Sequence, residues 1–251
     1  MKAEQFMWLK KFKYFLVHLS LSICVAFCCL GIVFYVWHPQ PLAKAVGVTN
    51  IFFMMLIIDV ILGPLLTLFI AKKGKKTLKF DLLVIGIFQI SALAYGMYNI
   101  IISRPVWIVF DTMRFELIQA NNIPQQILKN APVPYNHLGF LNPKWIAVKV
   151  AENEQEKSDR TFFELQTGIS PSMQPTLYEP IIKQSQLIRK NSHNLNELEQ
   201  YNPKMVVERI LIEYPEANAW LPLKASEIDM VVLINKQKAK VVKIVDLRPW
   251  N

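Results

Sequence analysis

Apolar residues dominate three long windows in the first hundred positions of the chain. Across residues 14–43, 45–71 and 82–103, the only Asp, Glu, Lys or Arg is Asp59. A helix needs about twenty predominantly apolar residues to cross a bilayer, and each window contains enough of them. The pattern therefore predicts three transmembrane helices, at about residues 14–37, 51–71 and 82–103.

Two other interpretations of these windows fit less well. A cleaved signal peptide has a shorter apolar run, and no small-residue cleavage pattern precedes His38-Pro39. Buried core helices of a soluble protein would carry more charge over such lengths. A hydrophobic content of 53% and a mean hydropathy of +0.25 also favour a membrane protein.

Beyond Arg104 the pattern changes to short β-branched and aromatic runs. Strands over 106–110 and 114–118 flank a polar turn and predict a hairpin. Further strands are expected over 145–151 and 161–165, with a solvated turn at 152–160, and a strand–turn–strand over 229–247. Short helices are expected over 121–131, 178–190 and 194–201, the last with Asn194 as cap and Glu197 at the capping-box position. The predicted fold is a membrane domain of three transmembrane helices, residues 1–103, followed by a small α+β extracytoplasmic domain, residues 104–251.

Charge distribution predicts the orientation. Residues 1–103 contain ten lysines and three acidic residues, a net charge of +7, whereas residues 104–251 have a net charge of +2. The pI of 9.4 therefore belongs mainly to the membrane part and does not indicate nucleic acid binding. Lysines cluster before the first helix and between the second and third: Lys2, Lys10, Lys11, Lys13, Lys72, Lys73, Lys75, Lys76 and Lys79. Because positive charge stays cytoplasmic, we expect a cytoplasmic N-terminus and, in a bacterial inner membrane, a periplasmic 104–251 domain.

Asp59 lies within an apolar window, where a charged side chain is energetically unfavourable. A charged side chain near the bilayer centre costs about 2.5–3.5 kcal/mol on insertion scales, so it is expected to face protein or water. At 1.5 Å per residue, Asp59 lies roughly 20 Å from Lys72, and Tyr95 lies roughly 21 Å from Asp81. The phenol of Tyr95 is therefore a candidate hydrogen-bond partner for Asp59. The pair either only joins the helices of this chain or contacts a partner.

Small and polar residues surround this position. Gly63 lies one turn after Asp59 and allows a close helix approach, while Pro64 removes one internal hydrogen bond. Ala92 and Gly96 give small-x-x-x-small spacing in the third helix, and Gln89 and Asn99 add polar groups. The predicted bundle uses these features internally or leaves a groove for a foreign helix.

The sequence contains no recognised catalytic motif. It lacks G-x-S-x-G, H-E-x-x-H, Walker and C-x-x-C patterns. His18, His38, His137 and His193 are scattered and are expected at interfaces or on the surface. Cys24, Cys28 and Cys29 all lie in the first apolar window, where cysteine serves as a small hydrophobic residue. No cofactor or metal is predicted.

The stretch from Asp59 through "GPLLTL", a basic loop and "KFDLLVIGIFQISALAYGMYNIIISRPVWIVFDTMRF" resembles the type IV pilin accessory proteins, the TfpX/TfpZ group. The resemblance is densest over residues 59–115 and includes the membrane-exit junction Arg104-Pro105 and Arg114. It implies an inner-membrane protein that supports pilus assembly or pilin stability, with no catalytic residue.

The leading hypothesis is a non-enzymatic, pilin-specific chaperone or assembly factor. Its partners would be the lipid bilayer and the major type IV pilin, held by its transmembrane helix and its globular head, with no nucleic acid partner. The candidate contact comprises Asp59, Gly63, Pro64, Gln89, Tyr95 and Gly96. The alternatives are a membrane enzyme that modifies pilin, for example by glycosylation, and a sensor of pilin status.

Overall fold

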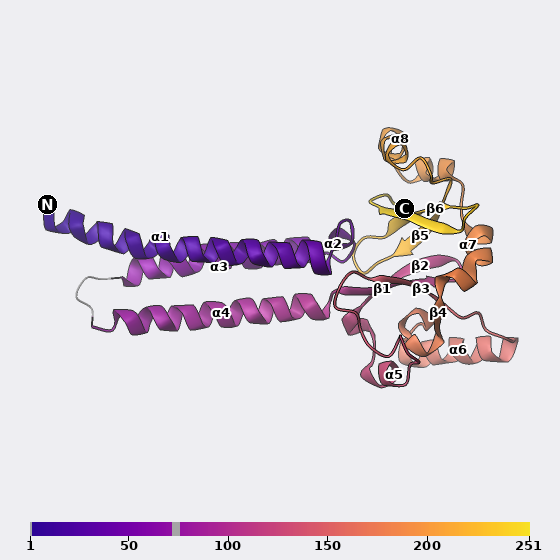
Figure 1. The fold of residues 1–251 in the computed structure, drawn as a ribbon, viewed down its shortest axis with the longest axis horizontal. Helices are drawn as coiled ribbons and strands as arrows, with labels where there is room; N and C mark the ends of the chain where they lie inside the picture. Colours follow the sequence, from indigo (N-terminus) through magenta and orange to yellow (C-terminus); the bar gives the residue numbers. More distant parts are fainter. Residues whose placement is uncertain (1, 72–75) are drawn as a thin grey trace. The chain divides into compact units, whose positions relative to one another are not determined.

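A computed structural model describes residues 2–71 and 76–251, with side chains from residue 11 onward. Lys72, Lys73 and Lys75 of the predicted cytoplasmic cluster lie outside the described residues. The chain forms two compact units. We call residues 1–36 and 48–102 the helical unit, and residues 37–47 and 103–251 the sheet unit (Figure 1).

Long helices build the helical unit, and their bounds are α1 Lys2–Gly31, continued by the π-helical turn η1 Ile32–Trp37, then α3 Val48–Ile70 and α4 Leu78–Ile102. Within the described residues, three helices are long and apolar enough to span a membrane, over Lys11–Trp37, Val48–Ile70 and Leu78–Ile102. The predicted fold class, membrane helices followed by a small α+β domain, is confirmed.

Helix α3 packs against both α1 and α4. Phe52 and Leu56 of α3 are buried, and the Phe52 ring meets Phe34 edge-on at a centroid distance of 5.6 Å. Many apolar side chains point away from the bundle instead; Phe27 and Phe69 are 69% and 72% exposed. Soluble monomers rarely expose so many large apolar side chains, and this surface is consistent with contact with lipid.

The sheet unit contains seven strands, with bounds β1 Pro105–Asp111, β2 Arg114–Gln119, β3 Lys144–Val148, β4 Tyr178–Pro180, β5 Ala219–Lys224, β6 Met230–Asn235 and β7 Lys240–Val245. Its α-helices are α2 Leu42–Ala45, α5 Gln125–Lys129, α6 Glu154–Thr167, α7 Ser185–Asn191 and α8 Lys204–Glu213. Short 3-10 turns complete it: η2 Ala120–Asn122, η3 Pro171–Met173, η4 Pro175–Leu177, η5 Ile181–Gln184 and η6 Leu195–Gln200.

The strands form one mixed sheet in the order β4-β3-β1-β2-β5-β6-β7. The predicted hairpin is present, with Phe110 opposite Phe115 in the antiparallel β1–β2 pair. β1 pairs with β3 in parallel and β2 with β5 in parallel, whereas all other neighbours are antiparallel. β7 and β4 are therefore the edge strands.

Both faces of the sheet are covered. Alternate residues point to opposite faces of a strand, so Ile108 and Phe110 join one core while Val109 joins another. The first core includes α2 and α7 through Leu42, Ala45 and Ile188. On the other face, α5 covers one part of the sheet and α8 another, where Val207 packs with Trp220. Because both faces are buried, the central strands are nearly continuous apolar runs.

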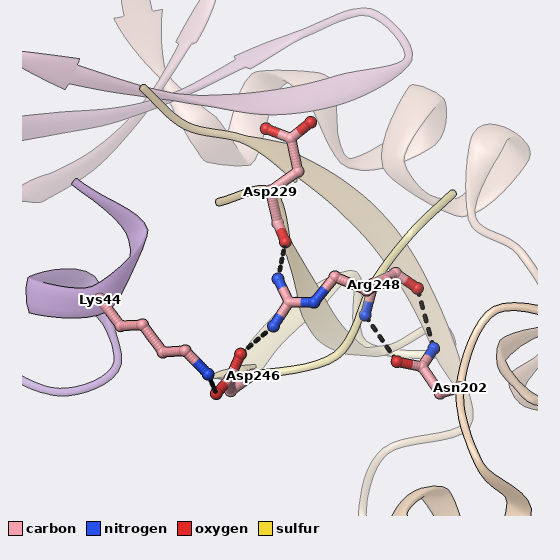
Figure 2. A network of polar contacts seen from close by, with 5 residues as sticks. All are labelled: Lys44, Asn202, Asp229, Asp246 and Arg248. Atoms are coloured by element: carbon pink, nitrogen blue, oxygen red, sulfur yellow. Dashed lines mark hydrogen bonds and ion pairs between the residues drawn. The ribbon is translucent and has the colours of Figure 1, made fainter. Parts of the chain in front are cut away.

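The connection between the first two long helices, residues 37–47, belongs to the sheet unit. The carbonyl of Ala45 accepts hydrogen bonds from the backbone N–H groups of Glu227 and Ile228, at 3.0 and 3.1 Å. Lys44 Nζ lies 2.5 Å from Asp246 Oδ2 (Figure 2). We call this segment the first loop; its packing into the α+β domain was not expected from the sequence.

Figure 2 shows how the C-terminal end of the chain is fixed beside the first loop. Arg248 contacts the Asp246 carboxylate and donates to the backbone carbonyl of Asp229. The backbone N–H of Arg248 donates to Asn202 Oδ1 at 2.7 Å, and Asn202 Nδ2 donates back to the Arg248 carbonyl at 2.9 Å. This network joins the segment after β7 to the turn before α8 and, through Asp246, to Lys44.

Three predictions in the sheet unit are wrong. The helix expected over 178–190 begins only after residue 180, because residues 178–180 form the strand β4 and pair with β3. Residues 161–165, expected as a strand, and most of residues 152–160, expected as a turn, belong to the helix α6. Asn153 caps this helix by accepting the Glu156 N–H at 2.8 Å, and Gly168 ends it with a left-handed φ of 71°. An Asn followed three residues later by a Glu is a capping-box pattern, and it indicates that a helix begins at this position. α8 and β5 were not predicted, whereas the Asn194–Glu197 capping box was predicted and is present.

Candidate functional site

A cavity of about 130 Å³ lies among the long helices of the helical unit. Its lining comes from α1, α3 and α4: His18, Leu21, Ser22, Val25, Ala26, Leu56, Asp59, Val60, Gly86, Gln89, Ile90 and Leu93. The lining is mainly apolar, with a few polar groups. Asp59 and Gln89 are the members that the sequence analysis predicted.

The close approach of α4 to α3 depends on Gly63. A Cβ at Gly63 would lie 1.9 Å from Gln89 Nε2, so any larger residue would displace the glutamine. This packing places Gln89 Nε2 2.9 Å from the backbone carbonyl of Asp59, to which it donates. Pro64 is buried next to Gly63 and cannot donate the helical hydrogen bond expected by the Val60 carbonyl. Gly63 and Pro64 therefore serve the packing of this bundle.

Two buried oxygen atoms in the cavity have unmet hydrogen-bonding capacity. Asp59 Oδ2 and Gln89 Oε1 have no hydrogen-bond partner among the residues that the structure describes. Both are acceptors, since a carboxyl oxygen and an amide oxygen carry lone pairs. Leaving a buried polar group unsatisfied costs about 1–3 kcal/mol. The cavity is thus suited to a group that donates hydrogen bonds.

His18 was expected at an interface or on the surface, but it contributes to this cavity. Its Nδ1 lies 2.6 Å from the hydroxyl of Thr67, which is buried in α3, and so joins α1 to α3. Ser22 lies one turn further along α1 and also lines the cavity. The sequence signal was the four-residue spacing of two polar residues in an uncharged window, which places them on one helix face.

Tyr95 and Gly96 lie away from the cavity lining. The Tyr95 side chain is 72% exposed, so the proposed Asp59–Tyr95 pairing is wrong; Gln89 takes the place of Tyr95 beside Asp59. Gly96 contacts the neighbouring helix, because a Cβ there would lie 2.0 Å from Met55 Sδ. The residue that lies beside Asp59 is therefore on the expected helix, α4, but on a different face of it from Tyr95.

The junction residues Arg104, Pro105 and Arg114 act within the sheet unit. The Arg104 guanidinium donates to the Gly139 carbonyl at 2.8 and 3.2 Å and lies 5.8 Å from the centroid of the Phe140 ring. Burial lowers the pKa of Arg104 from its usual value. Pro105 begins β1.

A polar cluster surrounds the buried Glu116 carboxylate of the β1–β2 hairpin. Arg114 donates twice to Glu116 Oε1, at 2.7 and 3.0 Å, and the Ser172 hydroxyl donates to Glu116 Oε2. Tyr178 donates its hydroxyl to the Ser172 carbonyl at 2.5 Å, and burial raises its pKa well above the usual value. The cluster is internally satisfied, which indicates a structural role. Among the described residues, no group of three or more His, Cys, Asp or Glu is placed to hold a metal ion.

Comparison with known proteins gives a consistent picture. Residues 6–47 match the family model of "Fimbrial assembly protein FimB". The fimbrial assembly protein of serogroup I of Dichelobacter nodosus is 31% identical over 231 residues, which cover 88% of this chain and 89% of that protein. The serogroup E1 protein is 30% identical with the same coverage. The protein of serogroups C1 and C2 is 41% identical over 110 residues, 43% of this chain and 83% of that protein. No solved structure matches the chain.

Proposed function

This chain belongs to the fimbrial assembly protein family of FimB, a type IV pilus accessory family, and on that premise we propose that it assists pilus assembly as a pilin-specific chaperone or assembly factor. We place it in the bacterial inner membrane, with a cytoplasmic N-terminus and a periplasmic sheet unit. The names of the relatives describe assembly and no reaction, which supports a role without catalysis.

The unpartnered acceptors Asp59 Oδ2 and Gln89 Oε1 carry the proposal. Polar groups inside a membrane protein are costly and are usually functional. Because both groups accept hydrogen bonds, the transmembrane helix that enters here brings a donor, such as an amide, hydroxyl or ammonium group. A pilin waiting in the membrane as a single helix with an exported head fits a helper that has both a bundle and an extramembrane domain.

Three glycines of α3 and α4 have different roles in this contact. Gln89 fills the space beside Gly63, and Met55 fills the space beside Gly96, so both glycines already contact side chains of the same chain. Gly86 lines the cavity, and a Cβ there would meet no atom within 4 Å. The open surface offered to a pilin helix is therefore centred on Asp59 and Gly86. Tyr95, exposed on α4, is a second candidate contact with that helix.

Co-expression with the cognate major pilin tests the proposal. Asp59→Leu removes the acceptor, and Gly86→Leu adds a side chain to the cavity lining at a position where a Cβ meets no atom within 4 Å. A hydrogen bond between membrane helices contributes about 0.6–2 kcal/mol, so we expect co-purified pilin to fall by about threefold to thirtyfold, together with the cellular pilin level. Gly31→Leu is the matched control, because Gly31 also has no atom within 4 Å of a Cβ and lies outside the cavity lining.

Normal pilin recovery with both variants, at normal levels of the helper, would refute the membrane contact. The intact mass of pilin, measured with and without this protein, distinguishes assembly from modification. We expect the same mass in both samples; a mass difference would favour the enzyme alternative.

A further inference from the structure

The sheet unit has an open groove beside its last strand. Its volume is about 700 Å³, and it lies where β7, β3, β1, η5 and the first loop come together. Apolar side chains form much of the lining, among them Leu42, Ile108, Trp145, Ile181, Val241 and Ile244. We call this the β7 groove. All of its lining residues belong to the sheet unit.

The curvature of the sheet creates the groove. In the strand order, β3 and β7 are separated by β1, β2, β5 and β6. Neighbouring strands lie about 4.8 Å apart, so a flat sheet would place β3 and β7 roughly 24 Å from each other. Trp145 of β3 and Val241 of β7 nevertheless line the same groove. The sheet therefore curls so that the β7 edge faces an apolar hollow.

β7 presents an unpaired edge to this hollow. It pairs with β6 on one side, and within the described residues no strand pairs with its other side. An exposed edge offers backbone N–H and carbonyl groups to an extended polypeptide. Added strands gain affinity from the main-chain ladder and specificity from pockets for alternate side chains. The apolar hollow beside β7 is a pocket of that kind.

The positive charge of the groove favours an acidic partner. Lys238, Lys240 and Lys243 line it, and its lining contains no Asp or Glu. None of the three forms a salt bridge with a described residue. By contrast, residues 104–251 as a whole are nearly balanced, with 18 basic and 16 acidic residues. Positive charge is thus concentrated at this edge.

Lysines on an edge strand also prevent unwanted pairing. Protection alone does not require an apolar hollow lined by Ile108 and Trp145. Half-buried Val241 and strongly exposed Ile182, at 70%, instead leave apolar surface for a ligand to cover.

From these observations we propose that the β7 groove binds an extended acidic segment of a partner polypeptide. The segment adds to β7 as a further strand, places alternate apolar side chains in the hollow, and pairs its carboxylates with the three lysines. This binding does not depend on the membrane contact. Only the identification of the partner polypeptide as a pilus subunit rests on the proposed function.

Peptide binding to the full chain in detergent micelles tests the inference. The probe is a fluorescein-labelled peptide that alternates glutamate and valine, followed by fluorescence anisotropy. Comparison peptides replace glutamate by lysine or carry N-methyl groups along the backbone, which block ladder hydrogen bonds. We expect the acidic peptide to bind and both comparison peptides to bind at least about tenfold more weakly.

Paired charge reversals test the site. Lys240→Glu with Lys243→Glu is expected to weaken binding of the acidic peptide by about tenfold. Lys129→Glu with Lys190→Glu makes the same change of net charge at exposed positions of α5 and α7, and we expect no effect. Equal binding of acidic and basic peptides, tight binding of the N-methylated peptide, or no effect of the β7 reversals would each overturn the inference.

A lipid ligand is the remaining alternative. Vesicles of phosphatidylglycerol that bind through Lys240 and Lys243, combined with no peptide binding, would show that the groove recognises anionic lipid instead. Gly86→Leu, which tests the membrane contact, is expected to leave peptide binding unchanged, so failure of one proposal is distinguishable from failure of the other.

Discussion

Asp111 lies at the end of β1, where burial removes part of its carboxyl group from water. Burial is the largest cause that raises its pKa, and the nearby Glu116 carboxylate raises it further. Arg114 opposes the shift but does not cancel it. A raised folded-state pKa gives a stabilising contribution that is complete below the unfolded-state pKa and is lost as pH rises through the folded-state pKa. At neutral pH the ionised Asp111 carboxylate therefore lowers the free energy of unfolding relative to the protonated carboxyl group.

Asp111→Asn removes this charge at nearly constant size. We expect a higher denaturant midpoint at pH 7, with the gain disappearing below about pH 4, where Asp111 is protonated. Tryptophan fluorescence of the full chain in detergent, measured at both pH values, checks this. Glu199→Gln, at an exposed position in η6, is the matched control and should change little. A lower midpoint at pH 7, or an equal gain at both pH values, would contradict the prediction.

At the scale of single residues, the sequence identified Asp59 and Gln89 but not His18 or Gly86. Asp59 is conspicuous because it is the only charged residue in its window. Gly86 looks like any other glycine in an apolar run, and only the packing of α1, α3 and α4 places it at a cavity. Tyr95 shows the opposite case, since its depth matched Asp59 while its helix face did not.

At the scale of elements, the first loop depends on its buried part more than on its ion pair. Ala45 is fully buried in the main core and its carbonyl accepts two backbone hydrogen bonds. Lys44 and Asp246 form a pair whose side chains are 51% and 36% exposed. Exposed pairs of this kind contribute about 0–1 kcal/mol.

Ala45→Asp therefore tests whether the first loop is part of the core. An unpaired carboxylate buried at this position should reduce the free energy of unfolding by about 3 kcal/mol or more. Lys44→Ala, the neighbouring control, should reduce it by at most about 1 kcal/mol. Denaturant unfolding of the full chain in detergent compares the two. Similar losses for both variants would show that the loop is only loosely attached.

Local chemistry explains which elements could be predicted. The β1–β2 and β6–β7 hairpins consist of β-branched and other apolar runs on either side of short polar turns, which is a strong local signal. α6 has no buried residue, so no apolar face marked it as a helix, and its Phe162-Phe163 pair favoured a strand. Pairing of β1 with β3 and of β2 with β5 joins segments far apart in the chain, and no local pattern encodes it.

At the scale of the whole molecule, the chain connectivity restricts the topology. The first loop and residues 103–251 form one unit, so we expect both on the same side of the membrane. The connection between α3 and α4 lies on the opposite side if each helix spans the bilayer. From the lysine distribution we then expect a cytoplasmic connection.

Cysteine labelling checks this orientation. In a chain with Cys24, Cys28 and Cys29 changed to alanine, Gln186→Cys places a thiol at an exposed site of α7, and Lys76→Cys places one in the connection. A membrane-impermeant maleimide should label Gln186→Cys in intact spheroplasts and Lys76→Cys only after lysis. The reverse pattern would invert the proposed topology.

The sequence by itself determined the membrane spans, the division into helical and α+β parts, and the costly acid at residue 59, because hydropathy and charge are properties of local composition. The tertiary structure decided which groups meet. In the structure, Gln89 packs against Gly63 and the first loop belongs to the sheet unit. The curled sheet brings β7 and Trp145 to the same apolar groove. These relations depend on packing between segments that are distant in the chain, and such packing follows from the complete set of contacts.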